Sequence, residues 1–197
     1  MVETIAPVVH EGNRSRYYTT VLLFALGATG AAALVGLVAG TLGMVLGAPW
    51  GTGRWIAVAA AALVYALREA FDLPVPVPDR HKQVPQWWRS FYSPPVTAIL
   101  YGFGLGIGYL TYLSYGTYFV VTIAAFVSGD PLIGAAISAP FGLGRALSVV
   151  LANRKTGTDD RQSGIDRIDD LASTRWPKMA NATTLLLVGA VTVAFSL

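Results

Sequence analysis

The chain has no cysteine among its 197 residues. Disulfide bonds, thiolate metal ligands and thiol redox chemistry are therefore excluded. Histidine is almost as scarce, and its two copies, His10 and His81, both lie in polar stretches. A histidine-based metal or haem site inside a membrane is not expected, so the sequence predicts a protein without a metal or another cofactor.

Charged residues are also rare. They make up 13% of the chain, whereas hydrophobic residues make up 54% and the mean hydropathy is +0.54. These values lie outside the range of a soluble domain of this length. No cleavable signal peptide is expected, because polar residues through Arg16 precede the first apolar run. The chain is predicted to be an integral membrane protein whose main surroundings are the lipid bilayer.

The sequence lacks recognised catalytic motifs, including a nucleotide-binding loop, a metalloprotease helix and a nucleophile–base arrangement. Its carboxylates suit structural roles. Asp130 precedes a proline as a helix N-cap, and Glu69 and Asp72 lie at a membrane edge near Arg68. The aspartates of residues 159–170 lie among arginines without the spacing of a calcium loop. Enzymatic activity is therefore not expected.

Five hydrophobic segments predict an all-α, polytopic membrane bundle of about five transmembrane helices. The spans cover residues 19–47, 55–71, 95–127, 131–152 and 179–197 of a single transmembrane domain (1–197), with cytoplasmic loops at 72–92 and 153–178. Placing the N-terminus inside puts twelve of the fourteen basic residues on the cytoplasmic side. Only Arg54 then lies outside, and Arg145 lies within a span. The predicted topology is N-in/C-out in the cell membrane.

The third segment is too long for one straight span. About 32 residues of helix would extend roughly 48 Å, whereas the hydrocarbon layer is about 30 Å thick. Four glycines alternate with larger residues at its centre, at positions 102, 104, 106 and 108. The segment must tilt, protrude or break near them. A break is tolerated only where protein or water covers the freed backbone groups.

Hydroxyl side chains follow these glycines. Thr111, Tyr115, Tyr118 and Thr122 recur at helical spacing and share one helix face. This face either forms hydrogen bonds between helices, with an outer aromatic belt, or lines the path of a solute. In the second interpretation the path consists of Gly104, Gly106, Gly108, Thr111, Tyr112, Tyr115, Tyr118, Thr122 and Arg145.

Two other features leave alternatives open. Arg145 can extend its long side chain to the cytoplasmic interface, or it can act as an anion-attracting or gating charge. Small residues form a stripe on the first span at Gly36, Gly40, Gly43 and Gly47. Such stripes pack helices closely within one chain or join two copies as a homodimer.

Part of the chain has a family resemblance. The residues that carry it are the run from Tyr101 to Thr111, and Gly129-Asp130-Pro131-Leu132 leading to Phe141-Gly142-Leu143-Gly144. Residues 93–151 resemble the second half of the DsbD/CcdA transmembrane family, within the LysE-type exporter superfamily. The resemblance implies a glycine-rich helix that breaks at mid-membrane. Tyr112-Leu113 replaces the family's Pro-Cys, so its electron relay is not implied.

The sequence thus predicts a small membrane transporter or exporter that moves an unidentified small solute past a glycine-bent helix. The alternative is a non-catalytic membrane subunit or assembly factor of a larger membrane complex. A second copy or a larger complex is the expected protein partner. Nucleic acid is not an expected partner, because the basic residues are spread over membrane-flanking loops.

Overall fold

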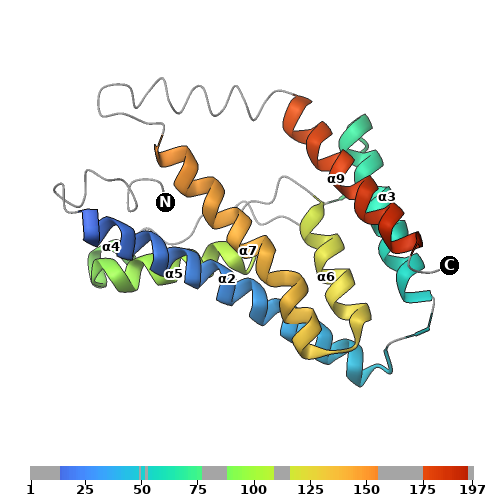
Figure 1. Cartoon of the computed structure of the whole chain (residues 1–197), viewed down its shortest axis with the longest axis horizontal. Coiled ribbons are helices and arrows are strands. Elements are labelled where there is room, and N and C mark those ends of the chain that lie inside the picture. The colour runs from blue at the N-terminus through green and yellow to red at the C-terminus, as the bar shows by residue number, and fades with distance from the viewer. Residues whose placement is uncertain are drawn as a thin grey trace. The chain divides into compact units, whose positions relative to one another are not determined.

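The computed structural model describes residues 14–48, 50–51, 53–76, 88–108, 116–154 and 175–194. Within these ranges every regular element is a helix, which confirms the all-α prediction for this part of the chain. The helices are α2 (Arg14–Val45), α3 (Gly53–Phe71), α4 (Trp88–Phe91), α5 (Pro94–Gly106), α6 (Thr117–Ser128), α7 (Pro131–Arg154) and α9 (Arg175–Ala194) (Figure 1).

Three of these helices are long and apolar enough to cross a membrane. They contain Ser15–Val45, Pro131–Val150 and Pro177–Ala194, which correspond to the first, fourth and fifth predicted spans. Helix α3 matches the second predicted span but carries three charged residues, Arg54, Arg68 and Glu69. The helices support an association with a membrane, and the five crossings and their orientation stay a prediction.

The third predicted span is two helices. Helix α5 has 13 residues and ends at Gly106, and α6 has 12 residues and begins at Thr117. Gly108 follows α5 with a φ of 72°, in the left-handed region that a residue with a β-carbon rarely adopts. The segment therefore breaks after its glycines, and it is not a single tilted helix.

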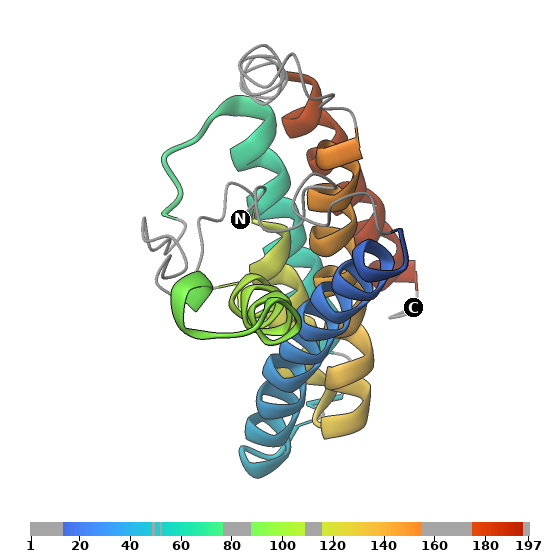
Figure 2. The same cartoon turned by 90° about the vertical axis from the view of Figure 1, so that its left-hand side faces the viewer.

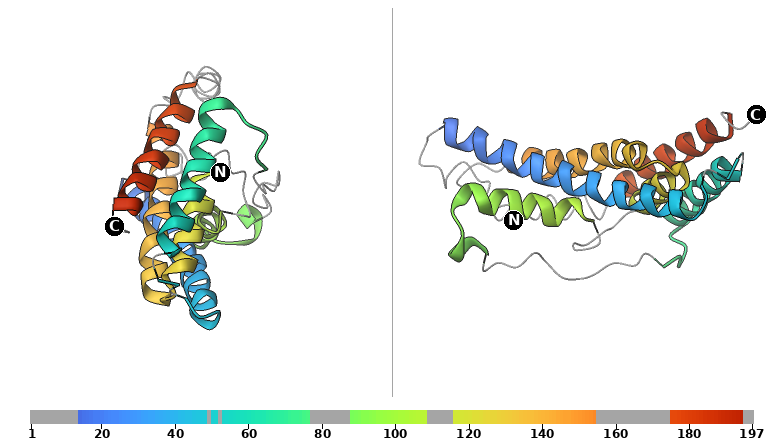
Figure 3. Two further views of the ribbon diagram at one scale, coloured as in Figure 1. Left: turned by 90° about the vertical axis from the view of Figure 1, so that its right-hand side faces the viewer. Right: turned by 90° about the horizontal axis from the view of Figure 1, so that it is seen from below.

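The chain divides into two compact units, to which α2 and α7 both contribute. Unit 1 comprises Met1–Ala32, Arg80–Tyr112 and Ala139–Asp170. In this unit α5 lies alongside the N-terminal part of α2 (Figure 3). The buried core consists of Phe24, Ala28, Ala98, Tyr101, Leu105 and Ala146. Its small residues let the helix backbones approach closely.

Unit 2 comprises Ala33–Asp79, Leu113–Ser138 and Leu171–Leu197. Helix α9 packs along α3, and α6 packs against α3 as well (Figures 1 and 2). The buried core of the unit consists of Val58, Ala62, Ala66, Val120, Val127 and Leu185. The polar groups described next lie at one end of this core.

Candidate functional site: a buried carboxylate network

A carboxylate is buried near the end of α3. The Glu69 side chain is only 4% exposed. Its Oε1 atom accepts a hydrogen bond from the backbone N–H of Gly116, at 2.8 Å, just before α6. Its Oε2 atom accepts a hydrogen bond from the side-chain amide of Asn181 on α9. Both oxygens of the buried carboxylate are therefore partnered.

Asn181 extends the network to a third side chain. Its Oδ1 atom accepts a hydrogen bond from the hydroxyl of Thr117, the first residue of α6, at 2.6 Å. The amide thus donates to Glu69 and accepts from Thr117, so it bridges two polar groups. We call Glu69, Gly116, Thr117 and Asn181 the Glu69 network. It joins α3, α6 and α9.

The local backbone explains why Glu69 is stable in this position. The first N–H groups of a helix have no partner within the helix, and the helix dipole places partial positive charge there. The Glu69 carboxylate lies at the N-terminal end of α6 and accepts a hydrogen bond from one of these N–H groups, that of Gly116. Burying a carboxylate without such partners would cost several kcal/mol, of the order found for other unpaired buried charges.

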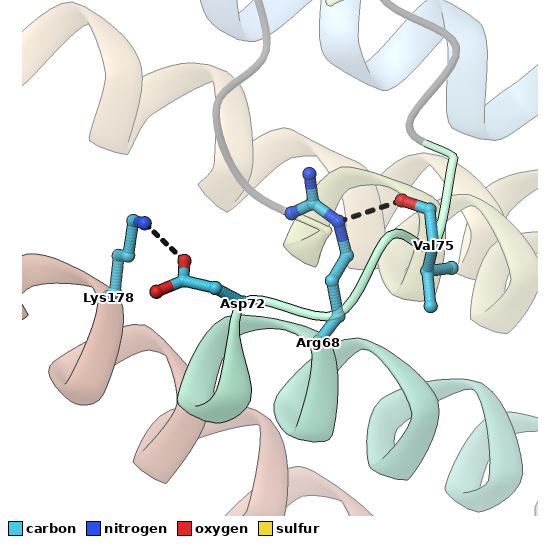
Figure 4. A network of polar contacts seen from close by, with 4 residues as sticks. All are labelled: Arg68, Asp72, Val75 and Lys178. Carbon is cyan, nitrogen blue, oxygen red and sulfur yellow. Dashed lines mark hydrogen bonds and ion pairs between the residues drawn. The ribbon is translucent and has the colours of Figure 1, made fainter.

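A second polar contact lies one helical turn beyond the network. Lys178 of α9 forms an ion pair with Asp72, which directly follows α3 (Figure 4). Arg68 turns the other way and donates from Nε to the carbonyl oxygen of Val75, at 2.9 Å (Figure 4). The side chains of Lys178 and Asp72 are 42% and 57% exposed. This end of the helix pair is therefore more open than the Glu69 network.

The chemistry of the network is that of a helix clamp. Its side chains are a carboxylate, an amide and a hydroxyl, and each makes a hydrogen bond to another member. In the part of the chain that the structure describes, no group of three or more potential metal-ligating His, Cys, Asp or Glu side chains comes together. The arrangement can fix the relative positions of three helices within unit 2.

The predicted polar stripe lies only partly in the described ranges. Thr111, Tyr112 and Tyr115 fall outside them. The side chain of Tyr118 is 2% exposed, and the Thr122 hydroxyl donates to the Tyr118 carbonyl oxygen at 2.8 Å. The two described members of the stripe are thus accounted for by burial and by the backbone of α6.

Arg145 makes contacts within unit 1. Its Nη1 atom donates to the carbonyl oxygen of Leu105, in the last turn of α5, at 3.2 Å. Its guanidinium group also lies over the ring of Phe141, 5.8 Å from the ring centroid. The structure therefore places Arg145 at the end of α5, beside the predicted Gly104, Gly106 and Gly108.

The predicted glycine stripe on α2 packs within the chain. A β-carbon at Gly36, Gly40 or Gly43 would overlap backbone carbonyl oxygens of the same unit, those of Gly134, Asp130 and Phe126 respectively. Gly47 has a φ of 84°, and a β-carbon there would meet nothing within 4 Å. This geometry favours packing within one chain over homodimerisation through the stripe.

The Glu69 network was not predicted from the sequence. The sequence pattern places Glu69 at a membrane edge and assigns no role to Asn181. The available signal was the polarity of two residues inside otherwise apolar helices, which usually face protein and pair with one another. The sequence does not indicate that Glu69 and Asn181 pair, because 112 positions separate them.

Known proteins similar to this chain share one name. The chain is 34% identical over 169 residues to a protein of Paracoccus versutus, a match that covers 85% of this chain and 58% of that protein. It is 38% identical over 96 residues to a protein of Methylophilus methylotrophus, covering 49% and 34% respectively. It is 35% identical over 139 residues to a protein of Methylorubrum extorquens, covering 69% and 48%. All three are named methylamine utilization protein MauF.

The matches span only part of these MauF proteins, from 34% to 58% of their length. No protein-family model matches the chain. No solved structure matches it either. The similarity to MauF therefore rests on the aligned sequences alone.

The MauF similarity corrects two predictions. The assignment to the DsbD/CcdA and LysE-type families is wrong, and so is the transporter function, because the relatives are named for methylamine utilization. The alternating glycines misled the assignment. A β-carbon at Gly102 or Gly106 would overlap the backbone of α2, so close helix packing explains these glycines without an exporter. The transport role of the predicted path residues is withdrawn together with the transporter function.

Proposed function

We propose that this chain is a MauF-type accessory protein, a non-catalytic membrane subunit or assembly factor that supports the use of methylamine. The observation that carries the proposal is the similarity to MauF of Paracoccus versutus over 85% of this chain. The apolar helices support a membrane location. The contacts of the Glu69 network also favour a structural role, in which three helices are held together, over a catalytic role.

The proposed partner is the enzyme system that oxidises methylamine. A cell that uses methylamine as a source of carbon or energy must break its C–N bond, and oxidation of the amine is a direct chemical route. A membrane protein without a reaction centre can serve such a system by helping to assemble it or by holding it at the membrane. The proposal includes association with that larger complex.

The proposed membrane arrangement is a single transmembrane domain in the cell membrane with five crossings, N-in/C-out. The distribution of basic residues supports it. At about 1.5 Å per residue, α5 and α6 would each extend only roughly 20 Å, less than the hydrocarbon thickness of about 30 Å. In this arrangement the two short helices cross the membrane together as one interrupted span.

Deletion of the gene tests the function directly. The deletion strain should fail to grow with methylamine as its only carbon source, and it should grow normally on succinate. A plasmid copy of the intact gene should restore growth on methylamine. Normal growth of the deletion strain on methylamine, with wild-type methylamine-oxidising activity in its extracts, would contradict the proposal.

Purification from membranes of methylamine-grown cells tests the partner. We expect the tagged chain to retain a subunit of the methylamine-oxidising system after mild detergent extraction. A tagged, unrelated membrane protein of similar abundance is the control. Recovery of the chain without any such subunit, also after chemical crosslinking in intact cells, would refute the association.

A further inference from the structure

The interruption between α5 and α6 creates two helix ends within an apolar segment. At the end of α5, carbonyl groups lose their helical partners, and at the start of α6, N–H groups lose theirs. Water satisfies such groups in a soluble protein, but the hydrocarbon layer offers none. In the proposed membrane arrangement the chain must therefore supply polar groups of its own at each end.

The carbonyl end of α5 receives a cation. Ile107 and Gly108 donate their N–H groups back to the carbonyl oxygens of Phe103 and Leu105, at 3.1 and 3.3 Å. Arg145 adds a third donor, its Nη1 atom on Leu105. The C-terminal end of a helix carries partial negative charge, so a guanidinium group is favourable there.

The amide end of α6 receives an anion. The Glu69 carboxylate accepts the Gly116 N–H group, and Gly116 is the N-cap residue of α6. The N-cap residue supplies no side-chain acceptor at this helix end, because it is a glycine. Asn181 and Thr117 then hold the carboxylate and the first turn together.

We propose that Arg145 and Glu69 are paired in function as charged caps that stabilise the interruption of the third segment. Arg145 compensates the negative end of α5, and Glu69 compensates the positive end of α6. Each charge has the sign that its helix end requires. This role explains why an arginine and a glutamate lie in apolar helices, where ionisable residues are costly. It rests on the proposed membrane arrangement and not on the proposed part in methylamine use.

Hydrogen–deuterium exchange of the full chain in lipid nanodiscs tests the two caps separately. Arg145→Met should speed exchange of the Ile107 and Gly108 amides by about tenfold and leave the amides of residues 116–120 unchanged. Glu69→Leu should have the reverse pattern, with faster exchange at residues 116–120 only. Ser148→Ala is the control on α7, because this exposed hydroxyl bonds only to the carbonyl oxygen of Arg145 in its own helix.

Conservative variants keep the test decisive if a cap variant fails to fold. Arg145→Lys retains the positive charge and should remain closer to wild type than Arg145→Met at residues 107–108. Glu69→Gln retains an acceptor oxygen without the charge and should show intermediate exchange at residues 116–120. The proposal is overturned if exchange at both helix ends stays at the wild-type rate in Arg145→Met and Glu69→Leu, or if each of these two variants changes both ends equally. Where these two variants do not fold, wild-type exchange at residues 116–120 in Glu69→Gln overturns it.

Discussion

At the scale of single residues, close backbone contacts between helices limit which glycines can be replaced by a larger residue. A β-carbon at Gly142 of α7 would overlap the carbonyl oxygen of Ala28 in unit 1. Gly106 of α5 meets the same carbonyl group, so Ala28 is contacted closely from two helices. Such contacts exchange side-chain volume for close helix approach, the usual basis of helix association in membranes.

Gly142 and Gly144 form a matched pair for testing this packing. A β-carbon at Gly144 meets nothing within 4 Å. Gly142→Ala should destabilise the protein by roughly 1–3 kcal/mol, as overpacking of a core does, whereas Gly144→Ala should be neutral or slightly stabilising. Thermal unfolding in detergent, followed by circular dichroism, measures both. Equal melting temperatures for the two variants would show that α7 is not held against α2 in this way.

Asn181 is the residue on which the Glu69 network depends. Asn181→Ala would remove the partner of Glu69 Oε2 and the acceptor of the Thr117 hydroxyl. We expect a loss of about 1–3 kcal/mol in the free energy of unfolding, because buried polar groups then lack partners. Chemical denaturation in mixed micelles measures the loss.

Thr184→Ala provides the control for Asn181. Thr184 is exposed on the same helix, and its hydroxyl donates only to the Ala180 carbonyl oxygen one turn earlier. Its removal should change the free energy of unfolding by less than about 0.5 kcal/mol, as for most surface substitutions. An Asn181→Ala variant as stable as Thr184→Ala would argue against a clamp.

At the scale of the helices, the end of α3 combines backbone geometry with charge. Asp72 has a φ of 51°, a left-handed conformation that aspartate tolerates better than most residues. The Leu73 N–H donates to the Arg68 carbonyl oxygen at 3.0 Å, as in a Schellman helix end. Asp72 therefore ends α3 by its backbone and contacts α9 by its side chain.

Substitutions at Asp72 separate these two roles. Asp72→Gly keeps the left-handed backbone and loses the exposed ion pair, which is worth about 0–1 kcal/mol. Asp72→Val loses the ion pair and adds strain, so it should be less stable than Asp72→Gly by about 1 kcal/mol or more. Lys178→Met measures the change in stability that loss of the ion pair causes without any change at Asp72. We expect Asp72→Gly to melt at a higher temperature than Asp72→Val. The reverse order would exclude backbone strain at this helix end.

At the scale of the whole molecule, the absence of cysteine makes topology accessible to labelling. Single cysteines placed at Thr52 and Gln83 test the N-in/C-out arrangement. A membrane-impermeant maleimide should label the cysteine at position 52 in intact cells, and it should label position 83 only after the cells are opened. The inverse pattern would reverse the proposed orientation.

Much of the helical pattern could be predicted from local sequence. Hydropathy predicted the helices α2, α7 and α9. Excess length and glycine alternation predicted that the third segment tilts, protrudes or breaks near its glycines, and the structure shows that α5 ends at Gly106. Asp130 acts as the expected N-cap, since its carboxylate accepts the N–H groups of Leu132 and Ile133 at 2.7 and 3.0 Å. These features depend on neighbouring residues only.

The candidate site was not predictable in the same way. The glycine pattern pointed to a solute path, because close packing and a bent transport helix place similar demands on sequence. Only the structure showed α2 backbone against Gly102 and Gly106. The role of Arg145 likewise depended on a contact with Leu105, 40 positions away.

The amino-acid sequence by itself determined an apolar, helical, cysteine-free chain with one segment too long to cross a bilayer straight. These properties follow from composition and from the rise of a helix per residue. Tertiary structure decided which side chains meet the ends of that segment. Glu69 reaches Gly116 across 47 positions, and Asn181 reaches Glu69 across 112. Such contacts arise when helices pack side by side, and no local spacing encodes them.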